Sequence, residues 1–199
     1  MKNESTRDLH IYWSALRGRR SAPERTDVDP GSIRHLLSDV FLLDLDEKTG
    51  AIFRLAGTRI CTLFGREVKD ELFSDLFEER GKTEIDRLIK GVAKEEKPLI
   101  AGIVAHIDDE QAIICELLFL PLRHRGQRSK RMLGMLSASE SIPIFMKPIK
   151  HLSMLTLKVL DEDMAHRSLR TPSLIVGIPT EQIISRHGHL VLINGERGA

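Results

Sequence analysis

The sequence predicts an α+β fold, in which a five-stranded antiparallel sheet carries helices over one face. Residues 40–55 alternate in polarity on either side of a short turn, which is typical of a hairpin. Residues 81–95 carry an apolar stripe at helical spacing, and three strand-like segments then follow within 99–140. Consecutive strands joined by short turns are antiparallel, and a helical layer buries the apolar face of such a sheet.

Length and composition are those of a single globular domain with appendages. The chain has 199 residues, of which 41% are hydrophobic and 30% charged, and its formal net charge is +1. This balance gives no general attraction to nucleic acid or an anionic membrane. The N-terminus is polar, and no apolar run approaches the roughly 18 residues of a membrane helix. Two cysteines exclude a disulfide scaffold, so we expect a reducing cytoplasm.

Residues 1–39 are expected to form an N-terminal helical cap. A helix over 6–20, capped by Ser5 or Thr6 and ended by Gly18, places four apolar side chains on one face. A second helix begins at Pro30 behind an Asp29 cap. The first helix holds the only Trp and the only Tyr of the chain, and a helix this short must dock on something to bury them. Its apolar face consists of Leu9, Tyr12, Trp13 and Leu16.

Residues 40–143 are expected to form the core. Strands 40–46 and 51–55 are followed by a helix over 58–64, a short helix or turn near 72–77 and the long helix 81–95. Strands 99–107, 112–122 and 131–140 complete the sheet, with a basic loop at 123–130. The second of these strands is almost entirely apolar, which indicates burial on both faces.

Residues 144–199 are expected to form a C-terminal extension without a core of its own. Ile149, Leu152, Leu155 and Val159 fit one helical face, whereas 174–176 and 190–193 are short strand-like runs.

Two motifs make the sequence resemble a known family. The first is W-x-x-L-R-G-x-R-x-x-P-x-R-x-D-x-D-P, beginning at Trp13, and the second is F-R-L-A-G-T-x-I, beginning at Phe53. With the order of elements, they resemble a bacterial family of small stand-alone PAS-like proteins over roughly residues 7–141. The resemblance implies strand order 2-1-5-4-3, a small cavity between sheet and helices, and dimerisation through the N-terminal helix. It also implies a regulatory function.

The implied cavity would be mostly apolar, as ligand pockets are. The same side chains could instead pack into a solid core, and this alternative stays open. For a homodimer, the candidate interface is Leu9, Tyr12, Trp13 and Leu16. The candidate cavity residues are Phe53, Leu55, Ile60, Leu63, Leu76, Leu88, Ile103, Cys115, Leu117, Leu133 and Met135.

The cofactor is left unknown, but flavin and haem are disfavoured. Photoactive flavin PAS domains carry an Asn-Cys-Arg-Phe-type motif, from which the residues around Cys61 depart. Haem-binding members usually carry a His on the long helix, and 81–96 has none. We interpret Cys61 and Cys115 as inert thiols, and His187 and His189, the only closely spaced histidines, as structural or solvated. No metal site is expected.

No catalytic residues are expected either. The adjacent acids Asp108, Asp109 and Glu110 belong to one turn, with nothing to separate their pKa values for acid–base work. We therefore expect a non-enzymatic sensory or regulatory module that contacts an unknown signalling protein and has a small ligand as an option. The alternatives are a small enzyme of the same fold and a weak binder of nucleic acid or anions. The second alternative would use the arginine-rich segments, and the net charge makes nucleic acid an improbable partner.

Overall fold

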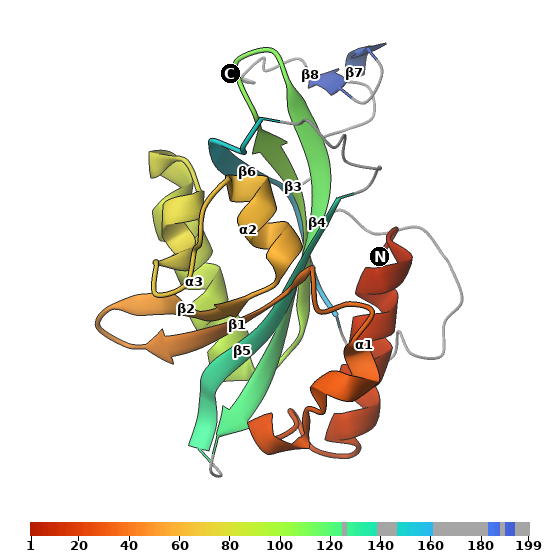
Figure 1. Ribbon diagram of the computed structural model, residues 1–199, viewed down its shortest axis with the longest axis vertical. Coiled ribbons are helices and arrows are strands. Elements are labelled where there is room, and N and C mark those ends of the chain that lie inside the picture. The colour runs from red at the N-terminus through yellow and green to blue at the C-terminus, as the bar shows by residue number, and fades with distance from the viewer. Residues whose placement is uncertain (125–126, 139–146, 161–182, 188–189, 194–199) are drawn as a thin grey trace, which may run out of the picture.

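A six-stranded antiparallel sheet separates the N-terminal α-helix from the other two α-helices (Figure 1). The computed structural model describes residues 1–124, 127–138, 147–160, 183–187 and 190–193. The strands are β1 (Val40–Asp46), β2 (Gly50–Ala56), β3 (Leu99–His106), β4 (Ala112–His124), β5 (Gln127–Ala138) and β6 (His151–Val159). The α-helices are α1 (Glu4–Arg17), α2 (Thr58–Phe64) and α3 (Glu79–Glu95), and the short 3₁₀ helices are η1 (Arg25–Asp27), η2 (Pro30–Ile33) and η3 (Phe73–Leu76).

The sheet order is β2-β1-β5-β4-β3-β6, so the expected order of the first five strands is confirmed. The strand count differs, because β6 adds a sixth strand. A helix over 149–159 was the wrong prediction. This segment pairs with β3 from His106↔His151 to Leu99↔Val159, with a bulge opposite Gly102 and Ile103. The β-branched residues Thr156 and Val159 favour a strand, and an apolar sheet edge supplies the partner.

The N-terminal elements follow the prediction with shifted ends. Asn3 caps α1 through its side chain, in place of Ser5 or Thr6, and Gly18 ends the helix. Asp29 caps the next element as expected, but only a short 3₁₀ helix follows it.

The basic segment 123–130 is not the expected loop. Strand β4 continues to His124 and β5 begins at Gln127, and these two residues pair across the hairpin. Further along the chain, β7 (Ile183–His187) and β8 (Leu190–Ile193) pair antiparallel, so the strand-like run 190–193 is confirmed. The run 174–176 lies outside the described residues. No helix in the described part of the chain is long and apolar enough to cross a membrane.

The glycine of the second motif is required by a close backbone approach. Gly57 is the N-cap of α2, at the point where the chain passes residues 37–38, and a Cβ atom there would lie 2.2 Å from the Leu37 carbonyl oxygen. Beside it, Arg59 places Nη1 2.9 and 2.7 Å from the two carboxylate oxygens of the buried Asp39. The motif therefore joins the start of α2 to the segment that leads into β1.

Two separate apolar cores lie on the two faces of the sheet, and β4 contributes to both. Its residues Cys115, Leu117 and Phe119 lie under α2, η3 and α3, whereas Leu118 and Leu120 lie under α1. Because side chains of a strand alternate between faces, a strand covered on both sides is apolar at nearly every position. The burial predicted for 112–122 is thus confirmed.

Candidate functional site

Phenylalanine rings fill the space between the sheet and the α2–η3–α3 layer. The five rings lie with neighbouring centroids 5.3–6.2 Å apart, in tilted and edge-to-face arrangements that aromatic pairs prefer. They come from two strands of one hairpin, from η3 and the residue after it, and from the central strand β4. The rings are Phe41, Phe53, Phe73, Phe77 and Phe119, and all are buried. We call this group the phenylalanine cluster.

One glycine makes room for the cluster. Gly134 of β5 pairs with Phe41 of β1, and a Cβ atom at Gly134 would lie 2.1 Å from the Phe41 ring. The ring therefore lies across the glycine, which places Phe41 against Phe119 of the next strand. Any larger residue at 134 would displace the ring on which the cluster is built.

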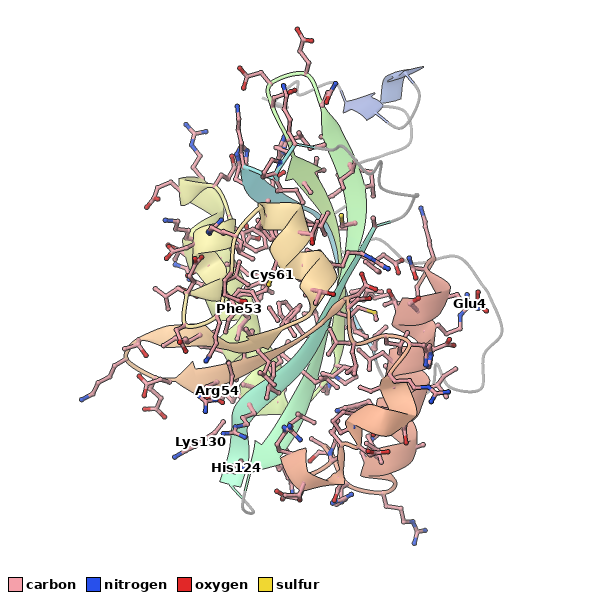
Figure 2. The ribbon with its side chains drawn as sticks, viewed as in Figure 1. Glu4, Phe53, Arg54, Cys61, His124 and Lys130 are labelled. Atoms are coloured by element: carbon pink, nitrogen blue, oxygen red, sulfur yellow. The ribbon has the colours of Figure 1, made fainter. Side chains whose placement is uncertain are left out.

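Most of the residues expected in this layer are there. Leu88 is half-buried and packs against the buried members. The predicted residues that are buried between sheet and helices are Phe53, Ile60, Leu63, Leu76, Ile103, Cys115 and Leu117. Figure 2 shows Phe53 and Cys61 on the helix-covered side of the sheet, with Glu4 of α1 on the other side.

Three predicted cavity residues are misplaced. Leu55 is 55% exposed, because a bulge at Arg54 makes Leu55 pair with Leu42, whose side chain lies on the α1 face. On β5, Leu133 and Met135 are buried beneath α1. Their neighbours Met132 and Leu136 lie in the other core, under α2, η3 and α3. Alternation grouped the residues of β5 correctly, but it does not indicate which group faces which layer.

The prediction missed four rings of the phenylalanine cluster. Phe73 and Phe77 are spaced i, i+4, and Phe119 continues the face begun by Cys115 and Leu117. These periodicities could have placed them in the core. Nothing in the sequence indicates that Phe41 lies over a glycine 93 positions away, because that contact depends on strand pairing.

Neither thiol is activated by its surroundings. Burial raises the pKa of Cys115 to about 12, because an apolar environment disfavours the thiolate. Burial also raises the pKa of the half-buried Cys61, whose Sγ atom donates to Glu67 at 3.5 Å. A thiol acts as a nucleophile in its thiolate form, so neither position provides an activated nucleophile near neutral pH.

The four predicted interface residues cover the opposite face of the same chain's sheet. Leu9 and Trp13 are fully buried there, so the predicted burial of Trp13 is confirmed within the chain. The Trp13 indole Nε1 donates to the Pro121 carbonyl oxygen at 2.9 Å. Tyr12 and Leu16 are partly buried beside them, and the Tyr12 hydroxyl accepts from the Asp29 amide at 2.8 Å.

A buried polar group anchors the start of α1. Glu116, the only charged residue in the apolar part of β4, accepts from the amides of Lys2 at 2.5 Å and Asn3 at 3.1 Å. One turn later, the hydroxyls of Thr6 and Ser137 share a buried hydrogen bond of 2.8 Å. These hydrogen bonds satisfy polar groups that would otherwise be buried without a partner, so they hold α1 in one position.

A second anchor lies after α1 and uses part of the predicted basic cluster. Arg123 donates to the buried Glu96 carboxylate at 3.0 and 2.7 Å and to the Ser21 hydroxyl at 2.8 Å. Ser21 also donates to Glu96. Arg131, from the same cluster, pairs with Asp44 at 2.9 Å. These two arginines are engaged within the protein, which reduces the positive charge that the segment presents to an anion.

The acidic turn has a structural role. The Asp108 carboxylate accepts from the amides of Glu110 at 3.1 Å and Gln111 at 2.9 Å, and these bonds hold its pKa below the usual range. Two histidines, His106 and His151, stack across β3 and β6. Within the described residues, no three or more His, Cys, Asp or Glu side chains are placed to hold a metal ion.

Comparison with known proteins assigns the fold to a family. Residues 1–137 match the family described as PAS domain. The chain belongs to this family. PAS domains are sensory and regulatory modules, and many mediate protein interactions. Among 28 matching chains of known structure is one described as "Flavin Analogue Sheds Light on Light-Oxygen-Voltage Domain Mechanism". It is 15% identical, with a TM-score of 0.44, and the match covers 56% of this chain and 84% of that one. No curated protein matches the chain.

Proposed function

We propose that this PAS protein is a non-catalytic regulatory module that acts through contacts with a signalling protein. The observation that carries the proposal is the sharing of one strand by two cores. Leu117 and Phe119 of β4 pack in the core under α2, η3 and α3. Glu116 and Leu118, which alternate with them along the strand, hold α1 on the other face. A change in packing under α2 and α3 therefore displaces the backbone on which α1 is docked.

The chemistry of the described residues supports a regulatory rather than a catalytic role. Both thiols have a raised pKa, and the acids of the 108–110 turn serve its backbone amides. The arginines that the sequence singled out at 123 and 131 form internal ion pairs, which weighs against nucleic acid as the partner.

A small ligand, if the module takes one, would bind among the phenylalanine rings and displace them. Apolar or aromatic molecules fit this lining, because pockets of this kind bind by burying apolar surface around few polar groups. Flavin remains disfavoured by the residues around Cys61, and haem by a long helix, α3, that contains no histidine.

Native mass spectrometry of freshly purified protein, followed by hydrogen exchange, tests the proposal. A retained or added aromatic compound is expected to alter exchange in α3 and, through β4, in α1. Phe119→Leu should produce the same paired change without a ligand, whereas Leu55→Ala, at an exposed position, should not. Exchange that changes in α3 and never in α1 would contradict the coupling. Turnover of any compound by the protein would contradict a non-catalytic role.

The homodimer expected through the N-terminal helix remains a proposal, and the structure limits how it can form. Leu9 and Trp13 are buried against the sheet of their own chain, so a second copy can contact only the outer side of α1. There Ile11 is 58% exposed among charged neighbours such as Arg7 and Asp8.

A further inference from the structure

Two histidines face each other where β6 begins. His106 and His151 are directly opposite in the β3–β6 ladder, and their rings stack with centroids 4.6 Å apart and planes 20° from parallel. Their neighbours Ala105 and Leu152 lie in the core under α2, η3 and α3, so the two rings lie on the other face of the sheet. The His106 Nε2 atom is 2.8 Å from the Ser153 hydroxyl oxygen. Both rings are half-buried, so protons from solvent can reach them.

The chain around this pair holds α2 in place. Residues 148–152 form a segment that we call the latch. The Ile149 amide donates to the Leu63 carbonyl oxygen of α2 at 2.7 Å, and the Ile149 side chain is buried in the core. Pro148 lies against Gly65, which ends α2, and a Cβ atom at Gly65 would lie 2.6 Å from the proline Cγ. The latch thus joins α2 to the start of β6 (Figure 1).

The other end of the latch contacts the start of α3. The Leu152 carbonyl oxygen accepts from the Glu78 amide at 3.2 Å. A bridge between Leu152 and Phe77 extends this contact to a member of the phenylalanine cluster. Release of the latch therefore loosens α2 and the start of α3 from the sheet at the same time, and both cover the cluster.

Positive charge on both rings is unfavourable in this arrangement. Histidines titrate between about pH 5 and pH 8, and like charges directly opposite each other across antiparallel strands are destabilising. Burial and the opposite ring hold the pKa of His106 below its ordinary value, whereas Glu78 acts in the other direction. Lys150 of the latch is exposed, and Asp108 is engaged with Lys147 at 3.4 Å. The open latch therefore binds protons more readily than the closed latch, so a falling pH favours opening.

We propose that the His106–His151 pair is a proton-operated switch. Uptake of protons by both rings separates β6 from β3 at this end and releases the latch, which opens a route for an apolar molecule to the phenylalanine cluster. The route for a ligand rests on the function proposed above. The release itself requires neither a ligand nor a signalling partner.

Hydrogen exchange of the full chain, followed by NMR, tests the release without a ligand. After correction for the intrinsic pH dependence of exchange, the Ile149 and Glu78 amides should lose protection about fivefold between about pH 7.5 and about pH 5, the effect of one unfavourable cross-strand pair. Amides in the middle of β5, which lies away from the pair in the sheet order, should keep their protection.

Four variants identify the group that responds. His106→Gln keeps a polar partner for Ser153 and removes the charge, so it should abolish the loss of protection. His151→Gln should reduce it, because burial still opposes a charge on His106. Glu78→Gln should enlarge it, since the nearby carboxylate is removed. His10→Gln, which alters the buried histidine of α1, is the matched control and should leave it unchanged.

The contrary outcomes are distinct. Unchanged protection of both amides at about pH 5 would overturn the switch, as would an equal loss throughout β5, which indicates general unfolding. A loss of protection that persists in His106→Gln, or disappears in His10→Gln, would assign the response to another group and overturn it as well.

Binding of the apolar dye anilinonaphthalene sulfonate tests the route. Its fluorescence should rise at acid pH with the wild-type protein and not with His106→Gln. Release of the latch without dye binding would overturn the route and, with it, the ligand option of the proposed function. A failure of coupling between α3 and α1 would overturn the proposed function alone and leave the switch supported by the exchange data.

Discussion

Replacing Trp13 measures how firmly α1 is held on the sheet. The indole ring is 1% exposed and packs against Leu9 and the apolar residues of β4 and β5, and its Nε1 donates to Pro121. Removing a fully buried tryptophan side chain costs about 3–5 kcal/mol. Trp13→Ala also leaves the Pro121 carbonyl without its donor, so we expect a loss near the upper end of that range.

A second variant separates the two contributions. Trp13→Phe keeps most of the buried ring and removes only the donor, and an unpaired buried acceptor costs about 1–3 kcal/mol. Ile11→Ala, on the exposed side of the same helix, should stay within about 0.5 kcal/mol of the wild type.

Urea denaturation followed by far-UV circular dichroism gives the free energy of unfolding for all three variants. Fluorescence is unsuitable, because Trp13 is the only tryptophan. Hydrogen exchange then shows whether Trp13→Ala releases α1 alone or destabilises the whole sheet. A loss below about 1 kcal/mol for Trp13→Ala would refute the docking described here, since no fully buried indole is removed so cheaply.

Three further predictions concern a core glycine, the two thiols and a histidine of α1. Gly134→Ala should destabilise the protein by about 1–3 kcal/mol, because the new Cβ displaces Phe41. Gly91→Ala in α3, with open space around it, should instead stabilise by about 0.5–1 kcal/mol. Equal effects of the two substitutions in urea denaturation would contradict the role of Gly134. Titration with a thiol reagent near neutral pH should modify only Cys61 in the native protein and both cysteines after denaturation, since Cys115 is buried with a pKa of about 12. Modification of both cysteines in the native protein would show that the core opens. Burial and the nearby Arg17 hold the pKa of His10 below its ordinary 6.5, so just below that pH the unfolded chain binds more protons than the folded protein. The free energy of unfolding should therefore fall as the pH drops below 6.5, and His10→Gln should flatten this slope.

The prediction from sequence succeeded where a pattern is local. The alternation in 40–46, the glycine after Phe64 and the apolar stripe of 81–95 each depend on residues a few positions apart, and the corresponding elements begin or end within about two residues of the prediction. The family resemblance supplied the order of the first five strands, which local patterns leave undetermined.

The helix expected over 149–159 shows the opposite case. Its apolar residues fit a helical face and a strand equally well, and the open edge of β3 decided between them. The side chains at 133 and 135 show the same dependence, because the strand that pairs with them determines which core they enter.

The sequence by itself determined most of the elements up to β5, the two-sided burial of β4 and the need for α1 to dock, because these follow from the spacing of apolar residues along one segment. Only the tertiary structure decided which side chains meet. The bulge that turns Leu55 outward, the glycine beneath Phe41, the buried Glu116 that anchors α1 and the pairing of β6 with β3 all depend on contacts between distant segments. A shift of one residue exchanges the two faces of a strand, so contacts across the sheet are not encoded in any single stretch of sequence.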